Sequence, residues 1–387
     1  MRGVSIIGVG TTPFGVCEGV SLKELACKAC LDALKDAGID KREIQAFYVG
    51  NFISGILVGQ ETIAPLIANG IGLPKDVPAT KVEGACCSGG IALRHGYLLV
   101  ASGAADFVLV AGVEKMTSAS TEKNTEGLAS AFDQETEGRT GLTFPGFFAL
   151  IARRHMHQYG TKPEHLGLVS VKNHSNGVSN PRARFRNPVS LDEVMASRII
   201  ADPLRLYDCC PISDGAAAAV LCPSDIAASF HPKPVDILSV AQTTGYSATY
   251  EMEDPTTLIA TVKAAKQAYE MANITPHDVD VAEIHDCFTI AEIVDSEDLG
   301  FFPKGRGGFA VEEGQTLLDG KIPINPSGGL ISKGHPVGAT GLGQIYELVI
   351  QLRGEHENQV KGAEIGLAHN LGGTGQLCTV TILRRRA

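Results

Sequence analysis

The 387-residue sequence has no tryptophan, and aromatic residues make up only 6% of it. This scarcity argues against a large aromatic binding surface and favours tightly packed turns of small residues. No apolar run reaches the roughly 18 residues that a membrane-spanning helix requires. Long runs of lysine and arginine are also missing, and the formal net charge is −10. We therefore expect a soluble α/β enzyme that binds neither nucleic acid nor an anionic membrane.

The ten cysteines show no sign of a disulfide framework. They are spread through apolar or glycine-rich segments of a long chain without a secretory leader, which indicates reduced thiols in a cytoplasmic protein. Cys27 and Cys30 form a CxxC pair within a helical pattern. Because no second pair at zinc-finger spacing accompanies it, a helix face is favoured, and no bound metal is expected.

The first fifty residues follow a strand, helix, strand order. Segment 4–10 is typical of a buried strand, and segment 46–49 of a second one. Ser21 and Glu24 form a capping box that opens a helix, which we expect to end near Gly38. This order is typical of an α/β fold, and the chain length predicts two or three structural units.

The same order returns later in the chain and indicates an internal duplication. At constant offset, Gly50-Asn51-Phe52 falls opposite His285-Asp286-Cys287. Chance similarity between common βα patterns is the alternative, and duplication is favoured over it. Two halves related by a pseudo-twofold axis would place the helices that open near Cys86 and Gly338 side by side. The matching segments are 37–44 with 272–279, 105–109 with 363–367, and 86–89 with 338–341.

An insertion separates these halves. Residues 117–143 are polar and contain glycine, residues 146–160 favour a helix, and residues 173–187 are rich in Asn, Pro and Arg. Residues 216–222 then resume a strand pattern. We expect the insertion to cover the site and to contact the substrate, as loops of this kind commonly do.

Three segments place reactive side chains close to glycine or to one another. Cys86, in Ala-Cys-Cys-Ser-Gly, is expected to open a helix whose free N–H groups and dipole favour a thiolate. His335, in Gly-His-Pro, lies in a rigid turn and could take a thiol proton. His285 and Cys287, in His-Asp-Cys-Phe, follow an apolar strand and are expected to face one side, with Asp286 facing away.

Each of these segments alone has a purely structural explanation. Cys86 and the adjacent Cys87 could be two small buried thiols, His335 a structural histidine, and 285–288 the polar end of a strand. Together they suit one cysteine-based acyl-transfer site. One thiol would hold an acyl group as a thioester, a histidine would activate it, and a second thiol would move protons.

These motifs, in this order, resemble the thiolase superfamily, specifically its branch similar to sterol-carrier-protein-type thiolases and archaeal or bacterial acetyl-CoA acetyltransferases. The resemblance extends over nearly the whole chain, with support from segments 113–116, 173–184 and 208–215. It implies an α/β thiolase fold of two βαβαβαββ halves in five α-β-α-β-α layers, with an inserted loop domain. It also implies a homodimer or a dimer of dimers. The expected units are 1–116 with 217–234, the insertion 117–216, and 235–387.

The resemblance also implies roles for the candidate residues. Cys86 would be the nucleophile and His335 its base. Cys287 would exchange a proton with the α-carbon of a second acyl-CoA, and His285 would help to hold the thioester oxygen. The backbone N–H groups of Cys86 and Gly372 would form a second oxyanion hole.

One position departs from the commoner thiolase pattern. Where many thiolases have a second catalytic cysteine in a Cys-x-Gly motif, this chain has Asn370. The resemblance to the branch with His-Asp-Cys-Phe then implies that the second thiol is Cys287, and Cys378 is expected to be structural. Asn370 is a candidate for the substrate pocket together with Phe147 and Phe148. The two phenylalanines belong to segment 144–148, which could line the acyl pocket or equally pack the insertion against the core.

The activity that this resemblance implies is Claisen condensation or thiolytic cleavage of a 3-oxoacyl-CoA through a cysteine thioester. Coenzyme A would be a substrate or product, and no permanently bound cofactor is expected. The alternatives are a degradative thiolase for a bulkier branched or aromatic 3-oxoacyl-CoA, a decarboxylating ketoacyl synthase-like enzyme, and a catalytically silent acyl-CoA scaffold. A small zinc-ribbon and OB-fold protein that helps to bind CoA is an expected partner.

Overall fold

The computed structural model describes residues 2–386 and contains one nine-stranded sheet in the order β3-β2-β4-β7-β1-β8-β11-β10-β9. The strands of the first half are β1 (Val4–Thr11), β2 (Ala46–Gly50), β3 (Ala79–Val82), β4 (Val108–Glu114) and β7 (Gly215–Pro223). Those of the second half are β8 (Val235–Thr244), β9 (Val281–Glu283), β10 (Ile365–Gly372) and β11 (Leu377–Arg385). A short antiparallel pairing of β1 with β8 joins the halves.

The two halves repeat one topology. β2 runs parallel to β4, as β9 does to β10, and the next two pairings are antiparallel in both halves. Phe47 pairs with Leu109, and Ala282 pairs with Leu367, which is the register that the repeated sequence segments predict. The counterpart of β3 is a single parallel bridge between Ala282 and Ile324. The predicted duplication is confirmed.

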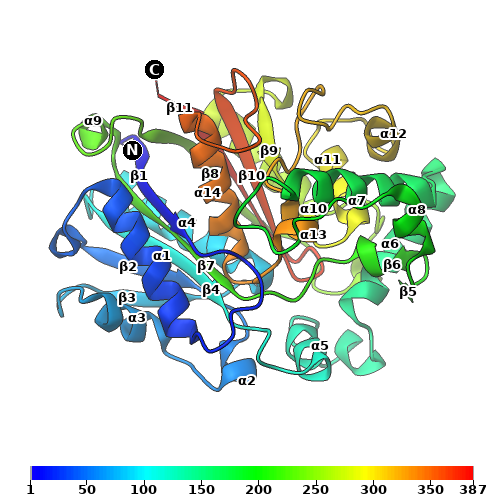
Figure 1. The fold of residues 1–387 in the computed structure, drawn as a ribbon, viewed down its shortest axis with the longest axis horizontal. Coiled ribbons are helices and arrows are strands. Elements are labelled where there is room, and N and C mark those ends of the chain that lie inside the picture. The colour runs from blue at the N-terminus through cyan, green and yellow to red at the C-terminus, as the bar shows by residue number, and fades with distance from the viewer. Residues whose placement is uncertain (1, 387) are drawn as a thin grey trace.

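The helices and the two halves of the sheet form alternating layers, α-β-α-β-α (Figure 1). On the outer side of the first half, α1 (Leu22–Ala37) packs on β1, β4 and β7, and α3 (Ile63–Ile71) packs on β2 and β3. In the middle layer, α14 (Thr340–Arg353) contacts both halves of the sheet and α4 (Ser88–Ala101). On the outer side of the second half, α10 (Ile259–Ala272) packs on β8 and β11, beside α11 (Thr289–Asp298).

The ends of α1 follow the predicted signals. The Ser21 side chain accepts the Glu24 N–H group, and the Glu24 carboxylate accepts the Ser21 N–H group. Gly38 ends the helix with a φ of 66°, a left-handed conformation that glycine adopts readily.

The two middle helices begin side by side, as the duplication predicts. A Cβ atom on Gly89 would lie 3.0 Å from the Gly338 oxygen, and one on Gly341 would lie 2.4 Å from the Gly90 nitrogen. Only glycine permits this approach of two helix N-termini. The approach brings segments from the two halves to one point at the centre of the molecule.

The insertion between β4 and β7 forms a mainly helical layer on one side of the molecule (green in Figure 1). β7 already begins at Gly215. The insertion contains α5 (Thr121–Ala129), α6 (Phe144–Tyr159), α7 (Pro163–Gly177), α8 (Leu191–Ala196), β5 (Ile199–Ala201) and β6 (Leu204–Arg205). Short helices elsewhere are α2 (Ser54–Val58), α9 (Ser224–Ala227), α12 (Gly307–Glu312) and α13 (Gly329–Lys333). Within residues 2–386, every helix is too short or too polar to cross a membrane.

Candidate active site

Cys86 lies in a strained turn that leads into α4. A 3₁₀ turn, η2 (Ala85–Cys87), runs directly into the helix, and Ala85 has a φ of 50°. This left-handed conformation is rare for a residue with a side chain, and such strain collects at functional sites. Cys86 is 8% exposed, whereas the Cys87 sulfur is fully buried 3.1 Å from the Asn370 oxygen. Cys86 is therefore the thiol that faces the cavity described below.

Two histidines from the second half meet Cys86. The Cys86 sulfur and a ring nitrogen of each of His285 and His335 all lie within 4.8 Å of one another. The two imidazole rings are nearly perpendicular, at 83°, with their centroids 5.0 Å apart. The structure thus brings together three side chains that the sequence predicted for one site. By distance alone, the three donor atoms would also suit a divalent metal.

The Gly-His-Pro turn holds His335 in place. Gly334 has a φ of 112°, and a Cβ atom there would lie 2.6 Å from the Ser213 hydroxyl. His335 Nδ1 is 2.6 Å from the hydroxyl of Thr340, at the start of α14. The sequence carried no signal that singled out Thr340 as the partner of this imidazole.

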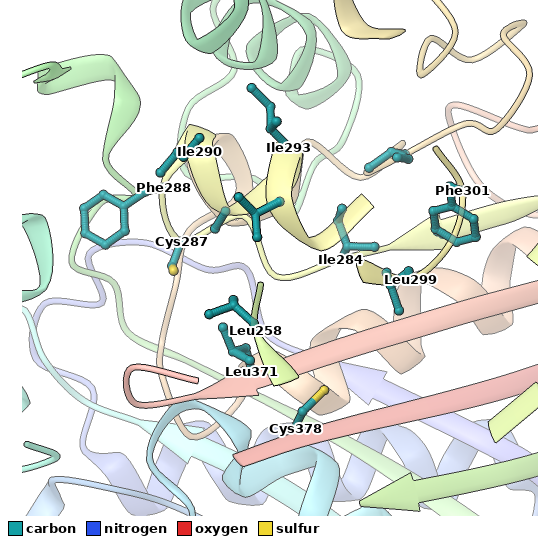
Figure 2. Close-up of a cluster of buried hydrophobic side chains, with 14 of the residues drawn as sticks. Leu258, Ile284, Cys287, Phe288, Ile290, Ile293, Leu299, Phe301, Leu371 and Cys378 are labelled. Carbon is teal, nitrogen blue, oxygen red and sulfur yellow. The ribbon is translucent and has the colours of Figure 1, made fainter. Parts of the chain in front are cut away.

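The His-Asp-Cys-Phe segment follows β9 directly. As predicted, His285 and Cys287 both line the cavity while Asp286 faces away. The Asp286 carboxylate accepts the Leu330 N–H group at 2.7 Å. The Cys287 carbonyl accepts the Cys210 N–H group at 3.0 Å. Figure 2 shows Cys287 directly before α11, at the edge of a cluster of buried side chains.

Burial sets the protonation of the free site. It lowers the pKa of His335 to about 3, and it lowers the pKa of His285 well below the ordinary value, so both imidazoles are neutral at neutral pH. Burial, with contributions from Cys87 and Glu114, raises the pKa of Cys86 to about 12. Burial therefore opposes the thiolate that the helix N-terminus is predicted to favour at Cys86. Burial likewise raises the pKa of Cys287, so both thiols are protonated.

Cys86 lies in the wall of an apolar cavity of about 210 Å³. Much of the wall comes from the insertion, the segment that the sequence predicts to cover the site. The end of the insertion also pairs with the second half, through bridges from Ile212 to His335 and from Cys209 to Phe288. The cavity is lined by Cys86, Met116, Thr125, Leu128, Thr143, Phe144, Pro145, Ile200, Leu206, Cys209, Cys210, Pro211, Ile212, His285, Cys287, Phe288, His335, Val337 and Gly373.

The predicted pocket residues need correction, because none of the three is part of this wall. Phe147 and Phe148 are buried in the core, and Phe148 stacks on Phe288 with ring centroids 4.7 Å apart. Helical periodicity brings Phe144 and Pro145 to the cavity instead. Asn370 is 2% exposed and lies behind His285, where its amide contacts the histidine.

Backbone N–H groups also face the nucleophile. The N–H groups of Gly373 and of Cys86 itself lower the pKa of the Cys86 thiol, which partly opposes the effect of burial. The neighbouring Gly372 pairs with Leu377 at the end of β10. The sequence predicts the N–H group of Gly372 for the oxyanion hole, and the next residue, Gly373, lines the cavity.

Comparison with protein families decides the relationship. The N-terminal domain model of thiolase matches residues 4–225, and a C-terminal domain-like model of thiolase matches residues 241–385. The chain belongs to the thiolase family. Its fold of two duplicated halves with an inserted loop domain is the thiolase fold.

Relatives of this thiolase are similar over the whole chain. It is 51% identical to an acetyl-CoA acetyltransferase of Methanothermobacter thermautotrophicus over 386 residues, which cover 100% of each chain. It is 37% identical to human sterol carrier protein 2 over 400 residues, or 99% of this chain and 72% of that protein.

Two solved structures share the fold. The Ltp2-ChsH2(DUF35) aldolase matches with a TM-score of 0.86 and 27% identity, over 99% of this chain and 98% of that one. Human mitochondrial 3-ketoacyl-CoA thiolase in complex with CoA matches with a TM-score of 0.76 and 18% identity, over 100% of this chain and 98% of that one.

Proposed function

We propose that this thiolase transfers acyl groups between coenzyme A thioesters through a thioester on Cys86. The observation that carries the proposal is the cluster of the Cys86 sulfur and two neutral imidazoles, within 4.8 Å of one another, in the wall of an apolar cavity. A neutral imidazole beside a protonated thiol can take the thiol proton when the substrate arrives. An acetyl-CoA acetyltransferase as a full-length relative supports the same reaction class.

In the first step, the proton of the Cys86 thiol moves to His335, and the sulfur attacks the carbonyl carbon of an acyl-CoA. The bond from that carbon to the CoA sulfur breaks, and CoA leaves with the proton that His335 returns. We assign the oxyanion of this step to backbone N–H groups around Cys86, those of Cys86 and Gly372 as the sequence predicts, with Gly373 also close to the sulfur.

In the second step, the Cys287 thiol first gives its proton to the neutral imidazole of His335, and the resulting thiolate takes a proton from the α-carbon of a second acyl-CoA. The carbanion attacks the Cys86 thioester, and the bond from the acyl carbon to Cys86 breaks. The product is a 3-oxoacyl-CoA, and the departing Cys86 thiolate takes the proton that His335 carries. His285 donates a hydrogen bond to the thioester oxygen of the second substrate, which stabilises the negative charge that develops there. Thiolytic cleavage is the reverse sequence.

The cavity supports an acyl group larger than acetyl. Its volume is about 210 Å³. Phe144, Pro145 and Ile200 supply apolar wall that an acetyl group would not fill. We therefore retain the degradative alternative, a branched or aromatic 3-oxoacyl-CoA. Thiolysis rates across 3-oxoacyl-CoAs of increasing bulk distinguish it from acetoacetyl-CoA chemistry.

Assembly and cellular location belong to the same proposal. We propose a homodimer or a dimer of dimers in the cytoplasm, with unit boundaries at 116, 216 and 234. The Ltp2-ChsH2(DUF35) assembly, similar in fold and sequence, supports a small partner protein, for which we propose a zinc-ribbon and OB-fold architecture. Copurification of a coexpressed partner and its effect on the KM for CoA test this part.

The central test compares two adjacent thiols. Cys86→Ala should abolish condensation and thiolysis, whereas Cys87→Ser should retain both within a few-fold because Cys87 faces Asn370 and Thr379 instead of the cavity. Turnover by Cys86→Ala would end the proposal. A malonyl thioester assayed beside acetyl-CoA excludes the decarboxylating alternative if only acetyl-CoA reacts.

A further inference from the structure

The Asn370 side chain makes three hydrogen bonds at the site, and they determine how its amide is oriented. The amide oxygen accepts the Gly90 N–H group at 3.3 Å. The amide nitrogen donates to the Cys86 carbonyl oxygen at 3.0 Å and lies 3.2 Å from His285 Nδ1. Gly90 N–H can only donate and the Cys86 carbonyl can only accept, so the amide cannot be turned around.

This orientation decides which nitrogen of His285 carries hydrogen. The second N–H of the amide points at Nδ1, which must therefore accept. A neutral imidazole that accepts at Nδ1 carries its hydrogen on Nε2. Because the Asn370 amide occupies Nδ1, Nε2 is the nitrogen left for the cavity that His285 lines, and its hydrogen is the one that a substrate oxygen can accept.

His335 is held in the opposite tautomer. The Thr340 hydroxyl oxygen lies 3.1 Å from the Pro336 carbonyl, to which it donates its hydrogen. It must then accept from His335 Nδ1, 2.6 Å away. With hydrogen on Nδ1, His335 presents the lone pair of Nε2. Cys86 thus lies between one imidazole that donates and one that accepts.

We propose that Asn370 is a positioning residue, whose amide holds His285 as a hydrogen-bond donor for the thioester oxygen of the second substrate. This inference rests on the proposed function. It gives the residue at the position of the second catalytic thiol a different task in this chain. The same hydrogen bond predicts that Cys86, His285 and His335 bind a metal weakly. A metal needs a lone pair from each imidazole, and Asn370 leaves His285 Nε2 with a hydrogen.

Two substitutions test the role of the amide. Asn370→Ala removes the donor, and Asn370→Asp replaces it with a carboxylate that accepts a hydrogen from Nδ1 and so reverses the tautomer. We expect kcat to fall about 10²-fold in Asn370→Ala and further in Asn370→Asp, with KM changed less than about 3-fold. Asn176→Asp, a buried asparagine that donates to the Asn325 carbonyl, is the matched control and should keep kcat.

The tautomer can be read without turnover. In protein with ¹⁵N-labelled histidine, the His285 signals, assigned through a His285→Ala variant, should show hydrogen on Nε2 in the native protein and on Nδ1 in Asn370→Asp. Hydrogen on Nδ1 of His285 in the native protein overturns the inference, and so does a kcat of Asn370→Ala within 2-fold of native. If Asn370→Asp does not fold, the native spectrum and Asn370→Ala still decide.

Zinc inhibition gives a second readout. Once the tautomer is reversed, Cys86, His285 and His335 can all bind Zn²⁺, so Asn370→Asp should be inhibited at a zinc concentration at least about 10-fold lower than the native protein. Equal sensitivity contradicts the inference. Acylation of Cys86 by acetyl-CoA, followed by intact mass, separates the two claims. If Cys86 is not acylated in the native protein, the proposed function is wrong. If Cys86 is acylated in Asn370→Ala but condensation is slow, the result supports the role of Asn370.

Discussion

The two halves of the molecule place different residues at two equivalent strand ends. In the first half, Gly50 pairs with Gly112 at the ends of β2 and β4. The same register in the second half leads to His285 and Asn370, whose side chains are hydrogen-bonded to each other. The first half thus has two glycines at the positions where the second half has His285 and Asn370, beside the nucleophile.

Packing explains why the first half has glycine at these two positions. A Cβ atom on Gly50 would lie 2.5 Å from the backbone of Ser88, and one on Gly112 would lie 2.4 Å from the Gly338 oxygen. These glycines let α4 and α14 approach the first half closely. The close approach brings Cys86 and His335 to the side chains of the second half. The comparison teaches that the two halves share one backbone arrangement but use equivalent positions differently. The first half uses them for close helix packing, and the second half uses them for side chains of the site.

The largest effect is expected from a matched pair at the next position along the repeat, Cys287 and Phe52. Cys287→Ala should lower kcat for condensation about 10²–10⁴-fold, because it removes the group that exchanges the α-proton. Phe52→Ala should lower stability but keep kcat within a few-fold. Steady-state rates and thermal unfolding of both variants test whether the second half carries the catalytic side chains and the first half the packing. A comparable loss of kcat in the two variants would contradict this difference.

A methyl group at Gly112, in the first half, should destabilise the fold. Gly112→Ala places a carbon against the Gly338 oxygen and 3.0 Å from the Ala339 Cα atom, both in backbone that cannot move freely. We expect the free energy of unfolding to fall by about 3 kcal/mol. Denaturant unfolding measures it. Gly103→Ala, where a Cβ atom would meet no neighbour within 4 Å, reports the cost of a left-handed conformation alone. Equal losses in the two variants would argue against the packing explanation.

Glu114 and Gly372 form a fourth pair of equivalent positions. The Glu114 carboxylate is buried and accepts N–H groups from Phe52 and Gly338. Burial raises its pKa from 4.5 to about 7, so the folded state keeps its proton while the unfolded state loses it. Stability from this group is present below pH 4.5 and is lost as the pH rises through 7.

That loss amounts to about 3 kcal/mol for a pKa difference of this size. Glu114→Gln cannot titrate, so its free energy of unfolding should change less than that of the native protein between pH 4.5 and 7. Urea unfolding at several pH values compares the two proteins. Parallel pH profiles would contradict a raised pKa for Glu114.

The smallest expected effect concerns the insertion, which has no counterpart of similar length between β10 and β11. Phe144→Ala enlarges the cavity wall and should shift kcat/KM toward a bulkier 3-oxoacyl-CoA over acetoacetyl-CoA by about 10-fold. Leu150→Ala, an exposed residue on the same helix, is the control. Competition between the two substrates measures the ratio, and an unchanged ratio in Phe144→Ala would place the acyl group elsewhere.

The repeat and its register could be predicted from sequence, because strand and helix patterns recur at constant offset and pairing preserves that offset. Cys86, His285, Cys287 and His335 could also be placed in one site, through motifs and resemblance. The protonation of Cys86 could not, because its pKa depends on burial by segments distant in the chain.

Finer features of the wall depend on the direction in which side chains turn. Phe144 faces the cavity while Phe147 and Phe148 face the core, a difference of helix phase that one aromatic-rich segment does not reveal. The contacts of Thr340 and Asn370 with the two imidazoles cross turns and strands, and no local pattern predicts them.

The most direct test of the account is to find where the acyl group is held. After brief exposure to acetyl-CoA, peptide mass spectrometry of the native protein should locate one acetyl group on Cys86, and the label should disappear when free CoA is added. The label should be absent from Cys86→Ala and slow to form in His335→Ala. Acetylation of Cys87, Cys210 or Cys287 instead, or no acetylation of the native protein, would contradict the account.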